Sequence, residues 1–209
     1  MRNVKKEKQL RDLDTQRIAE AAMAVIDELG ADGFTMRAVA KELNVTPMAL
    51  YHHVHDKAGL AGLLVDQAMR EIPLPSTSGN WREDMWAMAQ WMRQVTFAHP
   101  AISALRREFQ LWTPAVLQTT ERWLSLWQQT GLDLENSMRA ARSSSTAITG
   151  FVMEELTLRH IPLPKDSDLF MLPNMRVMFD RQSNQDGEFE LAVRALIDGI
   201  YARLTAQQL

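Results

Sequence analysis

The chain has 209 residues, of which 46% are hydrophobic and 23% charged, with a net charge of −3; these values fit one large or two small globular domains and argue against a disordered chain. It contains no cysteine, which excludes disulfides and thiolate metal sites and favours a reducing compartment. With no apolar run of about 18 residues and no signal peptide at the start, the sequence predicts a cytoplasmic protein without a membrane span.

Residues 2–17 are modestly basic, a pattern that suits either an arm along DNA phosphates or a solvated terminus. The first helix is then predicted from Asp14 as N-cap, with apolar residues at helical spacing from Ile18 to Leu29 and a left-handed stop at Gly30. Thr35 is the predicted cap of a second helix. That helix should end at Asn44, a residue type that tolerates left-handed geometry.

A third helix should follow after a very short turn. Thr46 is its predicted cap, and Pro47 occupies the first helical position, where a missing N–H has no cost. This helix should end near Val54. Asp56 is the predicted cap of a fourth helix, which runs to the proline at position 73.

The second half has a different composition, since all six tryptophans lie between Trp81 and Trp127. Helices are predicted from Trp81 to the proline at 100 and from Thr113 as a cap, and a long one runs from Asp133 to about His160. A last helix is predicted from Asp186 onwards. No β-hairpin pattern and no repeat is present, so the predicted fold class is all-α.

The second and third helices are the most informative part of the chain. A helix pair alone is weak evidence for DNA binding. The residue types on its outer face make that evidence stronger. Periodicity places Ala49, Leu50 and Val54 inward on the third helix. Instead of the Glu, Lys and Gln of an ordinary solvated face, the outward set is Thr46, Pro47, Met48, Tyr51, His52, His53 and Lys57.

This segment resembles the DNA-binding domain of the tetracycline-repressor (TetR) family of transcriptional regulators, over about residues 15–70. The motifs that carry the resemblance are Gly33-Phe34-Thr35, Arg37-Ala38-Val39-Ala40, Leu43-Asn44-Val45, Leu50-Tyr51-His52-His53-Val54 and Asp56-Lys57. The resemblance implies a homodimer whose recognition helices enter successive major grooves of a palindromic DNA operator.

Carried over by position, the resemblance divides the DNA-binding residues into two groups. Base-edge positions are matched by Arg37, Pro47, Met48, Ala49 and His52. Phosphate contacts are matched by Thr35, Tyr51, His53 and Lys57, and Thr46 is well placed at a helix N-terminus to assist them. The apolar run from Pro47 to Ala49 departs from the amide side chains common at such positions. It should favour contact with thymine methyl groups.

The spacing of His52, His53 and His55 is also compatible with a metal cluster. The only nearby carboxylate is Asp56, which is better used as a helix cap, and the chain has no cysteine to complete a site. We therefore expect no metal and no other cofactor.

Small residues on the last two long helices predict close approach to a second copy. The predicted dimer interface comprises Ser143, Ala147, Gly150, Ala195, Gly199 and Ala202. The alternative is ordinary packing within one chain.

Residues 131–140 and 187–200 resemble the ligand-binding domain of tetracycline-repressor-type members, which implies a pocket for a small-molecule effector. The candidate lining is Trp86, Met88, Met92, His99, Trp112, Trp123, Trp127 and Met153. Each of these residues also suits a hydrophobic core, and nothing in the sequence identifies tetracycline as the effector.

The predicted organisation is therefore a helix-turn-helix domain at 1–56, a linking helix at 57–72, and an effector-binding and dimerisation domain at 73–209. The predicted function is that of an effector-released repressor. The alternatives are an effector-independent or architectural DNA-binding protein and, less favoured, a helical-bundle enzyme. The sequence lacks a Glu-x-x-His pair, a phosphate-binding glycine loop and a nucleophile elbow, so we expect no enzyme.

Overall fold

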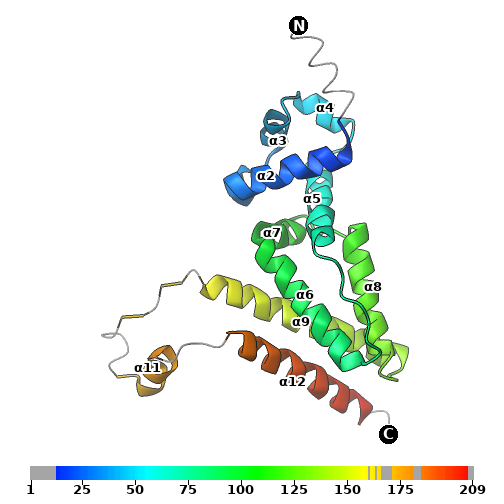
Figure 1. Ribbon diagram of the computed structural model, residues 1–209, viewed down its shortest axis with the longest axis vertical. Helices are drawn as coiled ribbons and strands as arrows, with labels where there is room; N and C mark the ends of the chain where they lie inside the picture. Colours follow the sequence, from blue (N-terminus) through cyan, green and yellow to red (C-terminus); the bar gives the residue numbers. More distant parts are fainter. Residues whose placement is uncertain (1–12, 160, 163, 166–170, 181–184, 207–209) are drawn as a thin grey trace. The chain divides into compact units, whose positions relative to one another are not determined.

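The computed structural model describes residues 13–159, 161–162, 164–165, 171–180 and 185–206 (Figure 1). All regular structure in that part of the chain is helical, which confirms the predicted all-α class. The chain divides into two compact bodies. The first comprises residues up to Leu74 together with 94–122, and the second comprises 75–93 together with the residues from Trp123 onwards.

Helix α2 (Thr15–Gly33) begins as predicted, since the Asp14 carboxylate accepts a hydrogen bond of 2.8 Å from the backbone N–H of Arg17. Gly30 does adopt a left-handed conformation, with φ of 67°, but it kinks the helix where the sequence predicted an end. The basic stretch at residues 2–12 lies outside the described residues.

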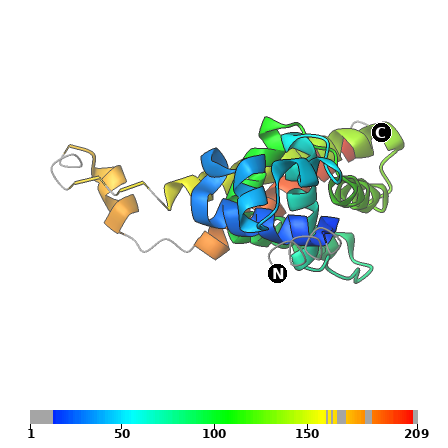
Figure 2. The same cartoon turned by 90° about the horizontal axis from the view of Figure 1, so that it is seen from above.

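Helices α3 (Met36–Glu42) and α4 (Pro47–Tyr51) form the short helix pair next to α2 (Figures 1 and 2). Thr35 caps α3 by accepting from the N–H of Ala38 at 3.1 Å, and Asn44 makes the turn with φ of 55°. The predicted side-chain cap at Thr46 is absent, and α4 ends three residues before Val54. Val54 is nevertheless buried, because the chain turns it back into the core.

Helix α5 (Lys57–Glu71) is capped by Asp56, which accepts from the N–H of Gly59 at 2.7 Å. Its apolar face is fully buried at Leu60, Leu64 and Val65. Helix α7 (Pro100–Glu108) and the first turns of α8 (Pro114–Gln128) join the same core. The buried core of the first body therefore unites α2–α5 with residues far along the chain, including Ile102, Leu105 and Val116.

Three polar contacts fix α5 to α7 and α8 along its whole length. At its start, Lys57 Nζ lies 4.0 Å from Glu108 Oε1. At its end, Glu71 Oε2 lies 2.9 Å from His99 Nε2. Between them, the buried Asp66 accepts a hydrogen bond of 3.0 Å from the N–H of Ala115 in the first turn of α8. Residues 94–122 therefore pack in the same compact body as the linking helix, and the domain division at residue 73 stays a prediction.

We expect Asp66→Ala to destabilise the first body by about 1–2 kcal/mol, because it removes the acceptor for a helix-terminal N–H in a part-buried site. Asp66→Asn keeps an oxygen that can accept the same bond and should recover most of the loss. Urea unfolding followed by tryptophan fluorescence measures the difference. Equal losses for the two variants would show that the Asp66–Ala115 hydrogen bond is not what stabilises this contact.

The second body contains residues 81–93 of α6 (Trp81–Ala98), the end of α8, α9 (Leu134–Leu158), α11 (Pro173–Asp180) and α12 (Gln185–Thr205). Its core is built on large side chains, with Met85, Met88 and Trp127 fully buried. Asp133 caps α9 as predicted, by accepting from the N–H of Asn136 at 2.8 Å. None of the described helices combines the length and hydropathy needed to cross a bilayer.

A buried ion pair joins α6 and α9 inside this body. Arg93 donates from Nε to Glu155 at 2.8 Å and forms a second bond from its terminal nitrogen to the same carboxylate. Asp186 accepts from the other terminal nitrogen, and the guanidinium lies 5.0 Å from the centre of the Phe189 ring. Hydrogen bonding to Glu155 is the main reason that the pKa of Arg93 is raised above its usual value.

Candidate nucleic-acid interface

Helix α4 has one face in the core and one face in solvent. Ala49 and Leu50 are buried, and Leu50 has no exposed surface. On the outer side Met48 is 68% exposed and Tyr51 is 45% exposed. Met48 and Tyr51 are three residues apart and therefore share one face of the helix, which exposes an apolar and an aromatic side chain together. A short rigid helix with this outer face suits insertion into a DNA groove.

Ala49 differs from the other residues predicted to face base edges. Its side chain is only 4% exposed and packs in the core of the first body. Helical periodicity had placed Ala49 inward, whereas the resemblance by position had placed it at the DNA. The burial agrees with periodicity. The apolar part of the proposed reading surface is therefore reduced to Pro47 and Met48.

The other nine predicted DNA-binding residues are exposed or half-buried. They are Thr35, Arg37, Thr46, Pro47, Met48, Tyr51, His52, His53 and Lys57. Arg37 is exposed on α3 and has no carboxylate partner among the described residues, so its guanidinium is available to a guanine edge. The Thr46 hydroxyl makes no capping bond, which leaves it available to a phosphate. These roles stay predictions.

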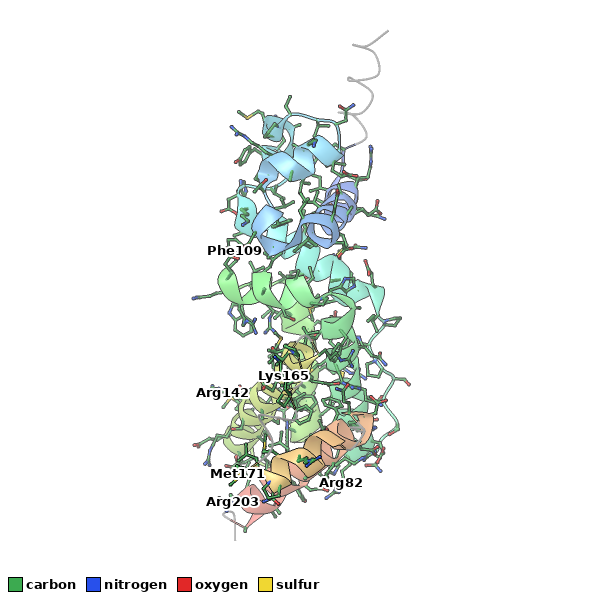
Figure 3. The ribbon with its side chains drawn as sticks, turned by 90° about the vertical axis from the view of Figure 1, so that its left-hand side faces the viewer. Arg82, Phe109, Arg142, Lys165, Met171 and Arg203 are labelled. Atoms are coloured by element: carbon green, nitrogen blue, oxygen red, sulfur yellow. The ribbon has the colours of Figure 1, made fainter. Side chains whose placement is uncertain are left out.

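The side-chain amine of Lys57 has defined contacts at the start of α5. Its amine lies 5.9 Å from the centre of the Phe34 ring and 5.5 Å from that of Phe109, beside Glu108 (Phe109 is labelled in Figure 3). The lysine side chain is 36% exposed and Glu108 is 54% exposed, so this pair is worth less than about 1 kcal/mol. A phosphate oxygen can replace Glu108 as the partner of the amine at little cost.

We expect Lys57→Ala to weaken binding to operator and random DNA alike and to lower the slope of log K against log salt by about 1, because one phosphate contact is lost. Fluorescence anisotropy titrations at several salt concentrations measure both quantities. Glu108→Gln is the matched control, since it removes the competing carboxylate and leaves the lysine in place. An unchanged salt slope in Lys57→Ala would assign the residue to packing alone.

The three histidines after α4 are not part of a metal-binding group of side chains in the part of the chain that the structure describes. Among the described residues, no group of three or more His, Cys, Asp or Glu side chains is arranged to hold a metal ion. Both His52 and His53 are exposed next to Tyr51 on the outer face of the helix-turn-helix.

The candidate pocket residues fall into two groups. His99 and Trp112 belong to the first body, where His99 contacts Glu71 and Trp112 is 66% exposed. The remaining six, Trp86, Met88, Met92, Trp123, Trp127 and Met153, belong to the second body. Trp123 and Trp127 are buried, and both indole N–H groups donate to the hydroxyl of Ser144, at 3.1 and 3.0 Å. Their burial agrees with the core alternative given in the sequence analysis, whereas their shared hydrogen bond to Ser144 was not predicted.

All six predicted dimer-interface residues are exposed in the single chain. Ser143, Ala147 and Gly150 lie on α9, and Ala195, Gly199 and Ala202 lie on α12. A hollow of about 180 Å³ lies between these helices and is lined by Arg139, Ala140, Ser143, Ile200, Arg203 and Leu204. Arg203 is labelled in Figure 3.

Sequence reasoning missed Asp66 and the Arg93–Glu155 pair. One signal was present, because Asp66 stands between the buried Val65 and Ala68 on the apolar side of α5. A carboxylate in such a position needs a hydrogen-bond donor, here the N–H of Ala115. The identity of that donor depends on a residue 49 positions away and has no local signature.

Together, the helix pair, the exposed outer face of α4 and the appended helical body define a helix-turn-helix protein with a second all-α domain. The model for bacterial regulatory proteins of the tetR family matches residues 18–63. The model for the tetracyclin repressor-like C-terminal domain matches residues 73–204. The chain belongs to the TetR family of bacterial regulatory proteins.

Individual relatives agree with this assignment. An HTH-type transcriptional regulator of Saccharopolyspora erythraea is 30% identical over 149 residues, which is 71% of this chain and 63% of the relative, so the match spans less than two thirds of that protein's length. Apo ActR from Streptomyces coelicolor is 24% identical, with a TM-score of 0.73 over 93% of this chain and 98% of ActR.

BioQ from Mycobacterium smegmatis is 23% identical, with a TM-score of 0.71 over 91% of this chain and 99% of BioQ. ActR has also been solved with actinorhodin, and BioQ with its natural double-stranded DNA operator. At these identities the likeness to both proteins concerns the fold.

Proposed function

We propose that this protein is a transcriptional repressor that binds a palindromic operator as a homodimer and is released by a small-molecule effector. The observation that carries the proposal is the outer face of α4, where Met48 and Tyr51 stand exposed on a helix whose other side is buried. The capped helix α3 and the left-handed turn at Asn44 support it by fixing the direction of α4. A protein that acts on an operator would work in the cytoplasm, where bacterial DNA lies.

The operator is read by two separate groups of residues. Arg37 and His52 supply polar contacts to base edges, and Pro47 with Met48 supplies apolar contact to thymine methyl groups. Thr35, Thr46, Tyr51, His53 and Lys57 contact phosphates and fix the register. A dimer is required because one helix-turn-helix reads too few base pairs to select an operator among the competing sites of a genome.

The effector site is assigned to the second body, with Trp86, Met92 and Met153 as its lining and Met88, Trp123 and Trp127 behind them in the core. The three lining residues are half-buried on α6 and α9, and the ring of Trp86 packs against that of Phe189, which also packs against Phe151. His99 and Trp112, in the first body, would respond to the effector through α7 and α8. Because relatives of this family are regulators, we propose no enzymatic activity.

A gel-shift titration with the DNA that flanks the protein's own gene tests the proposal. Binding to one palindromic fragment, weakened by salt and lost on addition of a compound from a ligand library, is the expected result. Binding without sequence preference would favour the alternative of an architectural DNA-binding protein. No binding at low salt would contradict both.

A further inference from the structure

Helix α9 carries an exposed face whose residues share a pattern. Arg139, Ser143, Ala147, Gly150 and Glu154 are all exposed, and they follow one another at steps of four, four, three and four. This spacing places them on one side of the helix. The middle of the face carries only small side chains, and its two ends carry opposite charges. Such a face can be approached closely by another helix.

Neither of the two end charges forms an ion pair with a described residue of the chain. Arg139 donates to the side-chain oxygen of Asn136 at 3.0 Å, but it has no carboxylate partner among the described residues. Glu154 likewise has no cationic partner in the described part of the chain, whereas its neighbour Glu155 is bound by Arg93 and Arg159. The one buried charge of α9, Glu155, is therefore paired, and the two charges at the ends of the outer face are available to another molecule.

Two copies of this face, placed antiparallel, would bring opposite charges together at both ends. Ala147 lies in the middle, Ser143 and Gly150 lie four and three residues from it, and Arg139 and Glu154 lie eight and seven residues from it. A two-fold axis through Ala147 would set two copies of α9 antiparallel. Each arginine would then face a glutamate of the other copy, with both pairs about 11 Å from the axis.

We propose that α9 packs against α9 of a second copy with the two-fold axis at Ala147, joined by two ion pairs between Arg139 and Glu154 of the partner subunit. The inference rests on the homodimer of the proposed function and specifies its register. A copy shifted by one turn, or one packed in parallel, would lose both ion pairs. The small side chains of the middle allow the two helix backbones to approach closely enough for the longer end residues to meet.

The neighbouring helix α12 continues the same surface. Leu191 is 71% exposed, and Ala195, Gly199 and Ala202 follow it along one side of α12. The hollow between α9 and α12, lined by Arg139, Ser143 and Arg203, offers space for partner side chains beside the axis. An exposed leucine next to a row of small residues is the composition expected where a symmetric interface continues.

Charge reversal of the full-length chain tests the register. Arg139→Glu and Glu154→Arg should each raise the dimer dissociation constant at least tenfold, because each change sets like charges together at both symmetric positions. The double variant R139E/E154R restores opposite charges and should return the constant to within about threefold of the wild type. Arg142→Glu is the matched control, because Arg142 (labelled in Figure 3) is an exposed arginine on α9. Three residues of an α-helix place it about 60° around the axis from Arg139.

Sedimentation equilibrium at nanomolar to micromolar protein concentrations measures the dimer dissociation constant. Circular dichroism verifies that each variant is folded. A dimeric wild type whose single reversals behave like Arg142→Glu, or whose double variant shows no recovery, would overturn this register and leave the dimeric repressor in place. A monomeric wild type throughout would overturn both the proposed homodimer and the inference.

A single cysteine provides a second readout. Because the chain has no cysteine of its own, Ala147→Cys creates one thiol per chain. A thiol at the axis should form a disulfide between two copies under mild oxidation. Arg142→Cys should not. Equal cross-linking of both variants would contradict an axis at Ala147.

Discussion

Replacing Glu155 with alanine is expected to lower the free energy of unfolding by about 3 kcal/mol. The Glu155 side chain is only 6% exposed and accepts hydrogen bonds from both Arg93 and Arg159. Removing it takes away the carboxylate that binds the guanidinium of Arg93 through two nitrogens, while the 86% exposed Asp186 stays as a partner of this 18% exposed side chain. The cost comes mainly from a buried charge that has lost its neutralising partner.

Urea unfolding measures this loss, with Glu135→Ala as a control on the same helix. Glu135 is exposed and forms no ion pair with a described residue, so its replacement should change stability by no more than about 0.5 kcal/mol. The double variant R93M/E155L replaces the pair with apolar side chains and should be close to the wild type. A loss below 1 kcal/mol in Glu155→Ala would mean that Arg93 does not depend on Glu155 for its stabilisation.

Arg37→Ala is expected to weaken operator binding by roughly 1–3 kcal/mol and to relax the preference at one base pair of each half-site. The guanidinium is exposed on α3 without a carboxylate partner among the described residues, so no interaction within the chain must be broken for it to reach a guanine. Binding to random DNA should change much less, because phosphate contacts are made by other residues.

Competition binding with operator variants at each position measures the change in specificity. Lys41→Ala is the matched control, since Lys41 is an exposed cation on the same short helix. It should weaken operator and random DNA to a similar and small extent. If Arg37→Ala behaves in the same way, then Arg37 contacts phosphate and reads no base.

Helix starts were predictable because they depend on local chemistry. Asp14, Thr35, Asp56 and Asp133 each accept a hydrogen bond from the backbone N–H three residues later, as their positions in the sequence indicated. Helix ends were less predictable. Gly30 has the expected left-handed geometry, yet it produces a kink, and α4 ends before Val54, because core packing decides where the chain turns next.

The contacts that organise the interior were not predictable from local patterns. The Asp66–Ala115 bond joins residues 49 apart, and the Arg93–Glu155 pair joins residues 62 apart. Most of the candidate DNA-binding residues could be predicted from the sequence, because they lie within one short segment. Ala49 was the exception, and there the periodicity of α4 predicted burial better than comparison by position did.

The helix-turn-helix is held as part of a body that includes α7 and the start of α8. Contacts at Lys57, Asp66 and Glu71 tie α5 to those helices from its first residue to its last. A change that moves α7 or α8 must therefore move α5 or break these contacts. Within this body, movement of α7 or α8 would therefore reach α5, the helix that follows the helix-turn-helix.

Hydroxyl-radical footprinting of the DNA that flanks the protein's own gene tests the central claim most directly. A dimer that presents two copies of α4 should protect two half-sites of a palindrome, with centres about 10 base pairs, or a multiple of one helical turn, apart. The protection should disappear together at both half-sites as salt is raised. A single protected half-site, or uniform protection along the fragment, would contradict the proposed dimeric, sequence-reading repressor.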